Sequence, residues 1–358
     1  MGTDTFFSTS SASAHMISEN SRLLYLQLLR IRTFEDRVGE LFLQGGSAGT
    51  MLHLSIGEEA PAVGVAEAME PKDSFTTHHR GHGIFLARGA DPKRMLAEIA
   101  GKEGGYCRGK GGSMHIADRK LGHLGANAIV GGGIPHVVGA GLSYQLLKVP
   151  AVSVAFFGDG AMQQGNLYES MNLAALWKLP VLFVCINNQY GMGTRLDQAS
   201  ASLEFVKRAE SFGLVGKEVS GLDVEEVKKE AMEILALARE GKPAFMKIDC
   251  YRFHGHARKD KSPYRDQNEE EEGRKKDPLK YQADRLLEQG VSVSEMDSWH
   301  KKVADEMDEA LNFALETQEP VLNSMFEDVY APNLTHPESV GSRIDRALYS
   351  DILLGDSR

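Results

Sequence analysis

The sequence predicts an α/β protein with three layers, in which a mostly parallel β-sheet lies between two layers of helices. The clearest sign is the order strand, helix, strand between Ala151 and Asn188. Two apolar runs, 151–157 and 181–186, have the length and β-branched content of buried strands, and helical spacing of apolar residues separates them. A crossover of this kind makes the two strands parallel, so both carboxyl ends lie at one edge of the sheet.

The elements before this unit are mainly helices. Apolar residues recur at helical spacing between Ser21 and Gln44, and a second helix is expected from Glu58 to Met69. Ser74–Thr77 is expected to form a short strand, followed by a polar turn at 78–83. Asp91 and Pro92 then provide the N-cap and first turn of a helix that reaches about Ala100.

Residues 101–141 hold 13 of the chain's 37 glycines. Glycine weakens the interiors of helices and strands, so this density favours backbone that lies close to a ligand. Pro135 begins a helix that leads into the strand at Ala151. The stretch from Leu121 to Leu147 lacks Lys, Arg, Asp and Glu, but its glycines and histidines would suit a lipid-facing helix poorly, so no membrane segment is predicted.

The C-terminal half continues the alternation of strands and helices. Strands are expected near 217–219 and at 244–250, with helices near 202–212, from Asp223 to Gly241, at 277–288 and at 294–317. Tyr251 to Lys276 is polar and is expected to be a mobile surface loop. The whole predicts one α/β domain at 21–330 with helical additions at both ends, a disordered tail at 1–20 and a polar C-terminal extension at 331–358.

Composition narrows the class of protein. Among the 358 residues, 42% are hydrophobic and 25% are charged, which is ordinary for a soluble globular protein. The net charge of −10 argues against a partner made of nucleic acid. The three cysteines are far apart and form no CxxC, and the first twenty residues lack the features of a secretory or transit signal. We therefore expect a cytoplasmic protein without a structural zinc site.

Polar residues follow both strands of the central unit. Gly158-Asp159-Gly160 ends the first strand and Asn187-Asn188 ends the second, so Asp159 and Asn188 are expected to be neighbours. A carboxylate and an amide oxygen beside a helix N-terminus suit a divalent cation that holds a diphosphate. Taken separately, a helix-capping aspartate and an asparagine turn explain the two signals equally well.

Two other phosphate-binding patterns match the chain less well. Gln163 stands where a dinucleotide fingerprint needs its third glycine, and an aspartate between glycines would repel a bare diphosphate. An NAD-binding protein is therefore disfavoured. The segment GGYCRGKG at 104–111 resembles a phosphate loop, but Gly111 replaces the obligatory Ser or Thr and no strand pattern precedes the segment. A nucleotide triphosphatase is likewise disfavoured.

The spacing GDG, 26 residues, NN resembles the thiamin diphosphate motif. The surrounding segments resemble the alpha subunit of the thiamin-diphosphate-dependent first component of 2-oxo acid dehydrogenase complexes, over about residues 20 to 330. NNQYGMGT and the HGH loop are most similar to pyruvate dehydrogenase, whereas HHRGHG and SMHIAD are equally similar to acetoin dehydrogenase. The matching segments are HLSIGEEA (53–60), HHRGHG (78–83), GKGGSMHIAD (109–118), GANAIVGGGIP (125–135), NNQYGMGT (187–194) and YRFHGHA (251–257).

The resemblance implies a thiamin diphosphate-binding fold with thiamin diphosphate and Mg²⁺ as cofactors. Asp159, Asn188 and the backbone carbonyl of Tyr190 would hold the metal ion. His53 would face the substrate cavity, and His256 would contact the cofactor and assist proton transfer. The other implied cofactor contacts are His79, where the family usually has tyrosine, Arg80, Asp118, the backbone of Ala128 and Val130, and the amides of Gly160 and Ala161.

The resemblance also implies a function and partners. The expected reaction is oxidative decarboxylation of pyruvate with acetyl transfer to a lipoyl-bearing acyltransferase component. Acetoin cleavage is the first alternative and branched-chain 2-oxo acids the second, and an inactive scaffold or an NAD-binding protein would be a different class. The implied glutamate that contacts the aminopyrimidine belongs to a separate beta subunit. The expected assembly is therefore an alpha2-beta2 heterotetramer acting on a small-molecule substrate.

Overall fold

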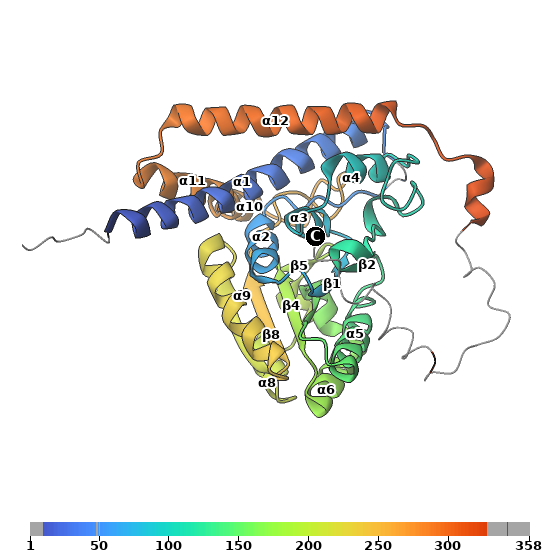
Figure 1. Cartoon of the computed structure of the whole chain (residues 1–358), viewed down its shortest axis with the longest axis vertical. Helices are drawn as coiled ribbons and strands as arrows, with labels where there is room; N and C mark the ends of the chain where they lie inside the picture. Colours follow the sequence, from blue (N-terminus) through green and yellow to red (C-terminus); the bar gives the residue numbers. More distant parts are fainter. Residues whose placement is uncertain (1–9, 48, 50, 328–341, 343–358) are drawn as a thin grey trace, which may run out of the picture.

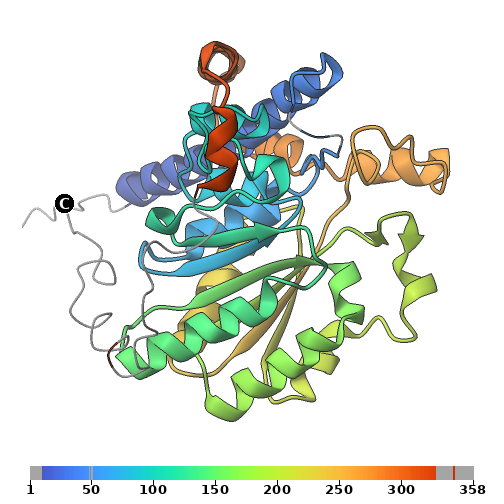
Figure 2. The same ribbon diagram turned by 90° about the vertical axis from the view of Figure 1, so that its right-hand side faces the viewer.

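A six-stranded parallel sheet forms the centre of the computed structural model, which describes residues 10–47, 49, 51–327 and 342. The strands lie in the order β2 (His123–Asn127), β1 (Ser74–His78), β3 (Ser153–Gly158), β4 (Val181–Asn187), β8 (Ala244–Asp249) and β7 (Val215–Ser220). Helices cover both faces of this sheet (Figures 1 and 2). The predicted three-layer α/β/α fold is confirmed.

The two central strands are buried on both faces, which is why their sequences read as continuous apolar runs. In β3, Val154 and Phe156 belong to one hydrophobic cluster and Ala155 and Phe157 to the other, because successive side chains point to opposite faces. The first cluster includes α2 (Glu59–Ala68) and α9 (Val224–Arg239), and the second includes α5 (Ile134–Leu147) and α6 (Gly165–Trp177). The side chains of β3 therefore pack against the helices on both faces of the sheet.

The helical additions pack together beyond the sheet, with α12 and α1 lying along one end of the molecule (Figure 1). Arg30 and Glu306 pair across these two helices at 2.6 Å. The helices of this layer are α1 (Ser10–Leu43), α3 (His82–Ala87), α4 (Pro92–Ile99), α11 (Pro278–Glu288) and α12 (Val293–Glu316). The shorter helices elsewhere are α7 (Leu196–Ala199), α8 (Phe205–Glu210) and α10 (Gln267–Lys275), and β5 (Tyr190–Gly191) pairs with β6 (Thr194–Arg195).

Several helix starts agree with their capping signals. Asp91 accepts a hydrogen bond from the backbone of Lys93 at the start of α4, and Asp223 caps α9 in the same way. Helix α1 begins at Ser10 instead of Ser21, so the part of the expected disordered tail from Ser10 onwards is helical, and residues 1–9 lie outside the described residues. The expected C-terminal extension at 331–358 also lies outside them, except for Ser342.

The glycines between 101 and 112 surround a buried carboxylate. Glu98 of α4 is fully buried, and four backbone N–H groups of this segment donate to its two oxygens at 2.7 to 3.0 Å. A Cβ atom on Gly105 would lie 2.3 Å from a Glu98 oxygen, so only glycine fits there. The amides of the apparent phosphate loop are therefore already used by Glu98. The donors are Cys107, Gly109, Gly111 and Gly112.

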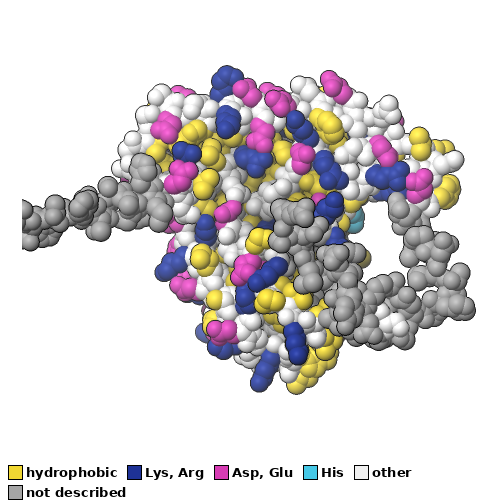
Figure 3. Space-filling view, in the orientation of Figure 1, with side chains coloured by type: hydrophobic (Ala, Val, Ile, Leu, Met, Phe, Trp, Pro, Cys, Tyr) yellow, Lys and Arg dark blue, Asp and Glu magenta, His cyan; other side chains and the backbone are white. Residues whose placement is uncertain are grey.

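The surface carries both signs of charge. Figure 3 shows Lys and Arg side chains interspersed with Asp and Glu over the face in view. Among the helices that the structure describes, none is both long and apolar enough to span a membrane.

Candidate functional site

The strand order reverses between β1 and β3. The chain passes from β1 to β2 on one side of this point and from β3 to β4 on the other. In open α/β sheets, ligands bind outside the carboxyl ends of the strands at such a reversal. His79 and Arg80 directly follow β1, and Asp159 and Gly160 directly follow β3. Four of the predicted site residues therefore follow the two strands that flank the reversal.

Asp159 is buried, and one of its carboxylate oxygens has no hydrogen-bond partner. Its side chain is 1% exposed, and its Oδ2 atom has no hydrogen-bond partner. Burial raises the pKa of Asp159 to about 6; the negative charge of Glu58 acts in the same direction, and a backbone hydrogen bond and the charges of Arg252 and Arg80 act against it. A buried carboxylate without a partner is costly, so this oxygen is suited to a ligand that the protein alone does not supply.

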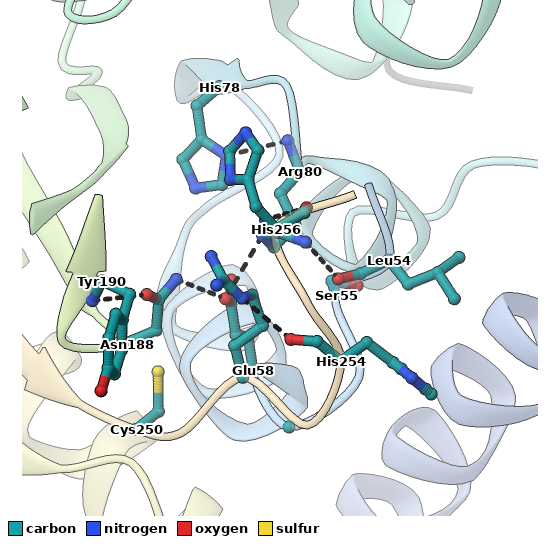
Figure 4. A network of polar contacts seen from close by, with 12 residues as sticks. Leu54, Ser55, Glu58, His78, Arg80, Asn188, Tyr190, Cys250, His254 and His256 are labelled. Atoms are coloured by element: carbon teal, nitrogen blue, oxygen red, sulfur yellow. Dashed lines mark hydrogen bonds and ion pairs between the residues drawn. The ribbon is translucent and has the colours of Figure 1, made fainter. Parts of the chain in front are cut away.

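Asn188 lies at the end of β4 and connects two segments of the site. Its Nδ2 donates to Glu58 Oε1 at 2.8 Å, and its Oδ1 accepts from the backbone of Tyr190 at 3.2 Å (Figure 4). The turn that follows packs against the Asp159 segment, since a Cβ atom on Gly160 would lie 3.5 Å from the Cα atom of Gly191. The backbone at Tyr190 therefore lies close to the start of the segment that carries Asp159.

Glu58 was missed among the predicted site residues. It is 2% exposed, and burial raises its pKa, with Arg80 and Asn188 acting in the opposite direction. The only signal in the sequence was its place in the HLSIGEEA segment, because a glutamate before a helix pattern reads as a surface residue.

Arg80 is a buried junction between three segments. Its Nη1 donates to the carbonyl of Leu54 at 2.6 Å, its Nη2 donates to the carbonyl of His256 at 2.9 Å, and its Nε lies 3.5 Å from Glu58 (Figure 4). Burial lowers the pKa of Arg80, and Glu58 acts against this shift. These contacts hold the loop after β8 against the loop before α2.

Three histidines from different segments form a cluster with Arg80 at its edge. The ring centres of His53 and His79 are 4.4 Å apart, those of His53 and His256 are 4.7 Å apart, and those of His79 and His256 are 5.2 Å apart. Burial lowers the pKa of His53 to about 3 and that of His256 to about 4, and the positive charge of Arg80 adds to both shifts. Burial and the neighbouring His78 also lower the pKa of His79. All three imidazoles are therefore neutral at pH 7.

The segment after β8 is partly buried and ends in a helix, whereas the sequence predicts a surface loop. Arg252 is 1% exposed and donates to the carbonyl of Met192 at 3.2 Å and to the hydroxyl of Tyr264 at 3.0 Å. The backbone of His256 donates to Asp260 at 2.7 Å. The last part of the segment forms α10, which begins after the N-cap Asp266. Polar composition indicated a loop, but buried arginines and an aspartate cap hold it in place.

The remaining predicted residues have local roles in the structure. Asp118 caps a 3₁₀ turn by accepting from the backbone of Lys120 at 2.9 Å. Ala128 and Val130 lie in the turn after β2, where Val130 is 49% exposed. Ala161 packs into the second hydrophobic cluster. Gly160 and Ala161, whose amides the resemblance places at a helix N-terminus, lie in the 3₁₀ turn Asp159–Gln163, and the α-helix α6 begins at Gly165.

Two hollows occur in the part of the chain that the structure describes. One of 510 Å³ is lined by Tyr190 and by residues around Arg195 and Arg265, and one of 330 Å³ is lined by the glycine segment at 109–114. Neither is lined by Asp159 or by the three histidines. The candidate site is therefore defined by its polar side chains. The carboxylate of Asp159 suits a divalent cation, and the neutral imidazoles suit proton transfer.

The chain is similar to a known family of enzymes over most of its length. Residues 27–323 match the dehydrogenase E1 component family. The chain is 40% identical over 317 residues to the alpha subunit of acetoin:2,6-dichlorophenolindophenol oxidoreductase from Bacillus subtilis, covering 88% of this chain and 95% of that one. It is 37% identical over 319 residues to the pyruvate dehydrogenase E1 component subunit alpha of Rhizobium meliloti, covering 88% and 91% of the two chains.

Proposed function

Because the chain belongs to the dehydrogenase E1 component family of thiamin-dependent oxidoreductases, we propose that it is the alpha subunit of a pyruvate dehydrogenase. The reaction would be oxidative decarboxylation of pyruvate with acetyl transfer to lipoyl-protein. The observation that supports the site most strongly is the unpaired oxygen of Asp159, buried beside the Asn188 turn at the reversal of strand order. This is the place at which open α/β sheets bind phosphorylated ligands.

The residues present fit thiamin diphosphate with Mg²⁺. Asp159, Asn188 and the carbonyl of Tyr190 would hold the cation, because Mg²⁺ prefers oxygen ligands and bridges carboxylates to phosphates. Gly160 has no side chain to obstruct a diphosphate, and its Cβ position has only Gly191 nearby. When bound, the cofactor supplies the electron sink for cleavage of the carbon–carbon bond next to the substrate carbonyl.

The chain's own residues would position reactants and move protons. His53 and His256 have neutral imidazoles near pH 7, so each ring has one nitrogen that accepts a proton and one that donates. Arg80 donates to the carbonyl of His256 at 2.9 Å and so holds the backbone of this residue in place. We assign proton transfer to these two histidines, and positioning of the His256 loop to Arg80.

A complete active site would need other chains. We propose an alpha2-beta2 heterotetramer in which the beta subunit supplies the group that activates the cofactor, and a lipoyl-bearing acyltransferase that takes the acyl group. The support is the identity of the chain to alpha subunits over 88% of its length. Turnover by the purified chain alone would contradict this dependence.

Acetoin cleavage is the second candidate function. The acetoin relatives from Bacillus subtilis and Cupriavidus necator are 40% and 39% identical to the chain, against 37% for the pyruvate relative from Rhizobium meliloti. The chain is thus about equally similar to the acetoin and the pyruvate enzymes, and both reactions would use the same cofactor site.

The test is the substrate preference of the assembled enzyme. The chain is expressed together with its beta partner, and reduction of an artificial electron acceptor is followed with pyruvate, acetoin and 2-oxoisovalerate. The proposal predicts the highest kcat/KM for pyruvate. A higher value for acetoin would overturn the substrate assignment and leave the cofactor assignment intact, whereas turnover that does not depend on thiamin diphosphate would overturn both.

A further inference from the structure

The three clustered histidines come from separate parts of the chain. His53 lies in the loop before α2, His79 follows β1, and His256 lies in the loop after β8. One nitrogen of each ring can be chosen so that all three lie within 4.8 Å of one another. Among the described residues this is the one group of three or more His, Cys, Asp or Glu side chains that could hold a metal ion.

The cluster contains nitrogen atoms that the protein does not satisfy. His53 is 3% exposed and its Nδ1 has no hydrogen-bond partner, and the same is true of the buried Nδ1 of His256. A buried polar atom without a partner is rare in proteins and usually has a functional explanation. His79 and His256 are only half-buried, so the cluster can be reached from outside.

From this geometry we propose that His53, His79 and His256 form a binding site for a transition-metal ion of the zinc type. Three imidazoles with water at the fourth position are a known ligand set for tetrahedral zinc. Zinc–nitrogen bonds of about 2.0 to 2.1 Å place the ligand atoms about 3.3 Å apart. The rings must therefore approach by no more than about 1.5 Å, which small rotations about their side-chain bonds can provide.

Charge and ligand type determine which ion the cluster accepts. The positive charge of Arg80 lowers the pKa of all three rings, and the carboxylate of Glu58 lies 3.5 Å from this guanidinium. Neutral imidazole binds zinc, copper and nickel ions well, whereas Mg²⁺ prefers oxygen ligands. The histidine cluster is therefore chemically separate from the proposed Mg²⁺ ligands Asp159 and Asn188.

Binding at this cluster has a consequence that rests on the proposed function. If His53 and His256 move protons in the reaction, a bound zinc ion occupies the nitrogen atoms that they need. Zinc would then act as an inhibitor of turnover. Metal binding itself does not depend on the reaction and is measured without substrate or cofactor.

The test is zinc binding by the full-length chain after removal of metals with a chelator. Calorimetric titration with Zn²⁺ is expected to give one site per chain. Substitution of any one histidine, in His53→Ala, His79→Ala or His256→Ala, is expected to weaken that site by at least about 100-fold, since loss of a direct ligand costs at least as much as loss of its supporting contacts. The matched control is His136→Ala, which removes an exposed histidine on α5.

X-ray absorption at the zinc edge of the wild-type chain provides a measurement that needs no variant. It is expected to show three imidazole nitrogens at about 2.0 to 2.1 Å. Absence of a zinc site in the wild type, a shell dominated by sulfur, or equal binding by all three variants and the control would each overturn the proposal. If the wild-type chain binds zinc but turnover of the assembled enzyme is not inhibited by it, the result would count against the proposed proton-transfer role of the histidines, and not against the zinc site.

Discussion

Glu98 and Asp159 are both buried carboxylates, but their surroundings differ. Glu98 is fully buried and accepts four backbone N–H groups from the glycine-rich segment. Asp159 is 1% exposed, yet its Oδ2 has no partner and its pKa is raised by burial to about 6. Since burial is nearly equal, the difference lies in what the protein provides around each charge. The oxygens of Glu98 are satisfied by the protein, whereas Oδ2 of Asp159 is left without a partner.

The comparison also separates two uses of glycine. Around Glu98, glycines are needed because side chains would collide with the carboxylate or with nearby backbone, as at Gly105 and Gly109. At Gly160 a Cβ atom would meet only the Cα atom of Gly191, at an ordinary contact distance of 3.5 Å. The space beside Gly160 is therefore available to a ligand, and the space beside Gly105 is filled by the protein.

The largest expected effect is on catalysis at Asp159. In the assembled enzyme, Asp159 would pair with the proposed Mg²⁺ ion. Asp159→Asn is therefore expected to lower turnover at least about 100-fold, because removing one member of a buried charge pair costs about 3 to 5 kcal/mol. The measurement is dye reduction at saturating substrate with varied Mg²⁺. The control is Glu309→Gln. Glu309 forms an exposed ion pair with Lys93, so this substitution should leave turnover unchanged. An active Asp159→Asn enzyme would place the metal ion elsewhere.

The next effect is on stability at Glu98. Glu98→Gln keeps one acceptor oxygen and places an amide N–H₂ against two N–H donors, so about two charge-assisted hydrogen bonds are lost. Each contributes about 1.5 to 3 kcal/mol, which predicts a free energy of unfolding lower by about 3 to 6 kcal/mol. Chemical denaturation followed by circular dichroism measures this change. If the variant is as stable as the wild type, the glycine segment does not depend on the carboxylate.

The smallest effect is the pH dependence that Asp159 gives to the ligand-free chain. Its folded-state pKa of about 6 lies above its ordinary value of 3.8, so the folded state binds the proton more tightly than the unfolded state. This contribution to stability is fully present below pH 3.8 and is lost as the pH rises through 6, amounting to at most about 3 kcal/mol.

Asp159→Asn should remove this dependence. The difference in unfolding free energy between variant and wild type is measured at pH 5 and at pH 7.5, and the variant is expected to gain relative stability at the higher pH. A difference that is constant with pH would mean that Asp159 is already ionised and satisfied in the ligand-free protein.

The sheet could be predicted from sequence where local signals and packing agree. The runs at β3 and β4 are apolar because both faces are buried, and Asp91 and Asp223 cap the helices that they were expected to cap. Strand β2 was missed because its sequence, HLGAN, has only one large apolar residue, Leu124. It is held by parallel pairing with β1, and its His123 stacks on Phe75 at 4.6 Å.

Residues of the candidate site could be predicted from the sequence where they follow a strand or belong to a family motif. Asp159 and Asn188 follow from strand ends alone, and His53, His79 and His256 followed from the family resemblance. The sequence did not predict that Glu98 would use the loop amides, that Glu58 would bind Asn188, or that Arg252 would be buried. Each of these depends on contacts between segments far apart in the chain, which no local pattern encodes.

The central claim is that Asp159 and the Asn188 turn hold a divalent cation together with a diphosphate. The most direct measurement is calorimetric titration of the assembled enzyme with thiamin diphosphate, with and without Mg²⁺, in the wild type and in Asp159→Asn. The account predicts tight binding by the wild type only when Mg²⁺ is present, and no Mg²⁺-dependent gain in the variant. Equal affinity of the wild type with and without Mg²⁺, or an unchanged gain in the variant, would contradict it.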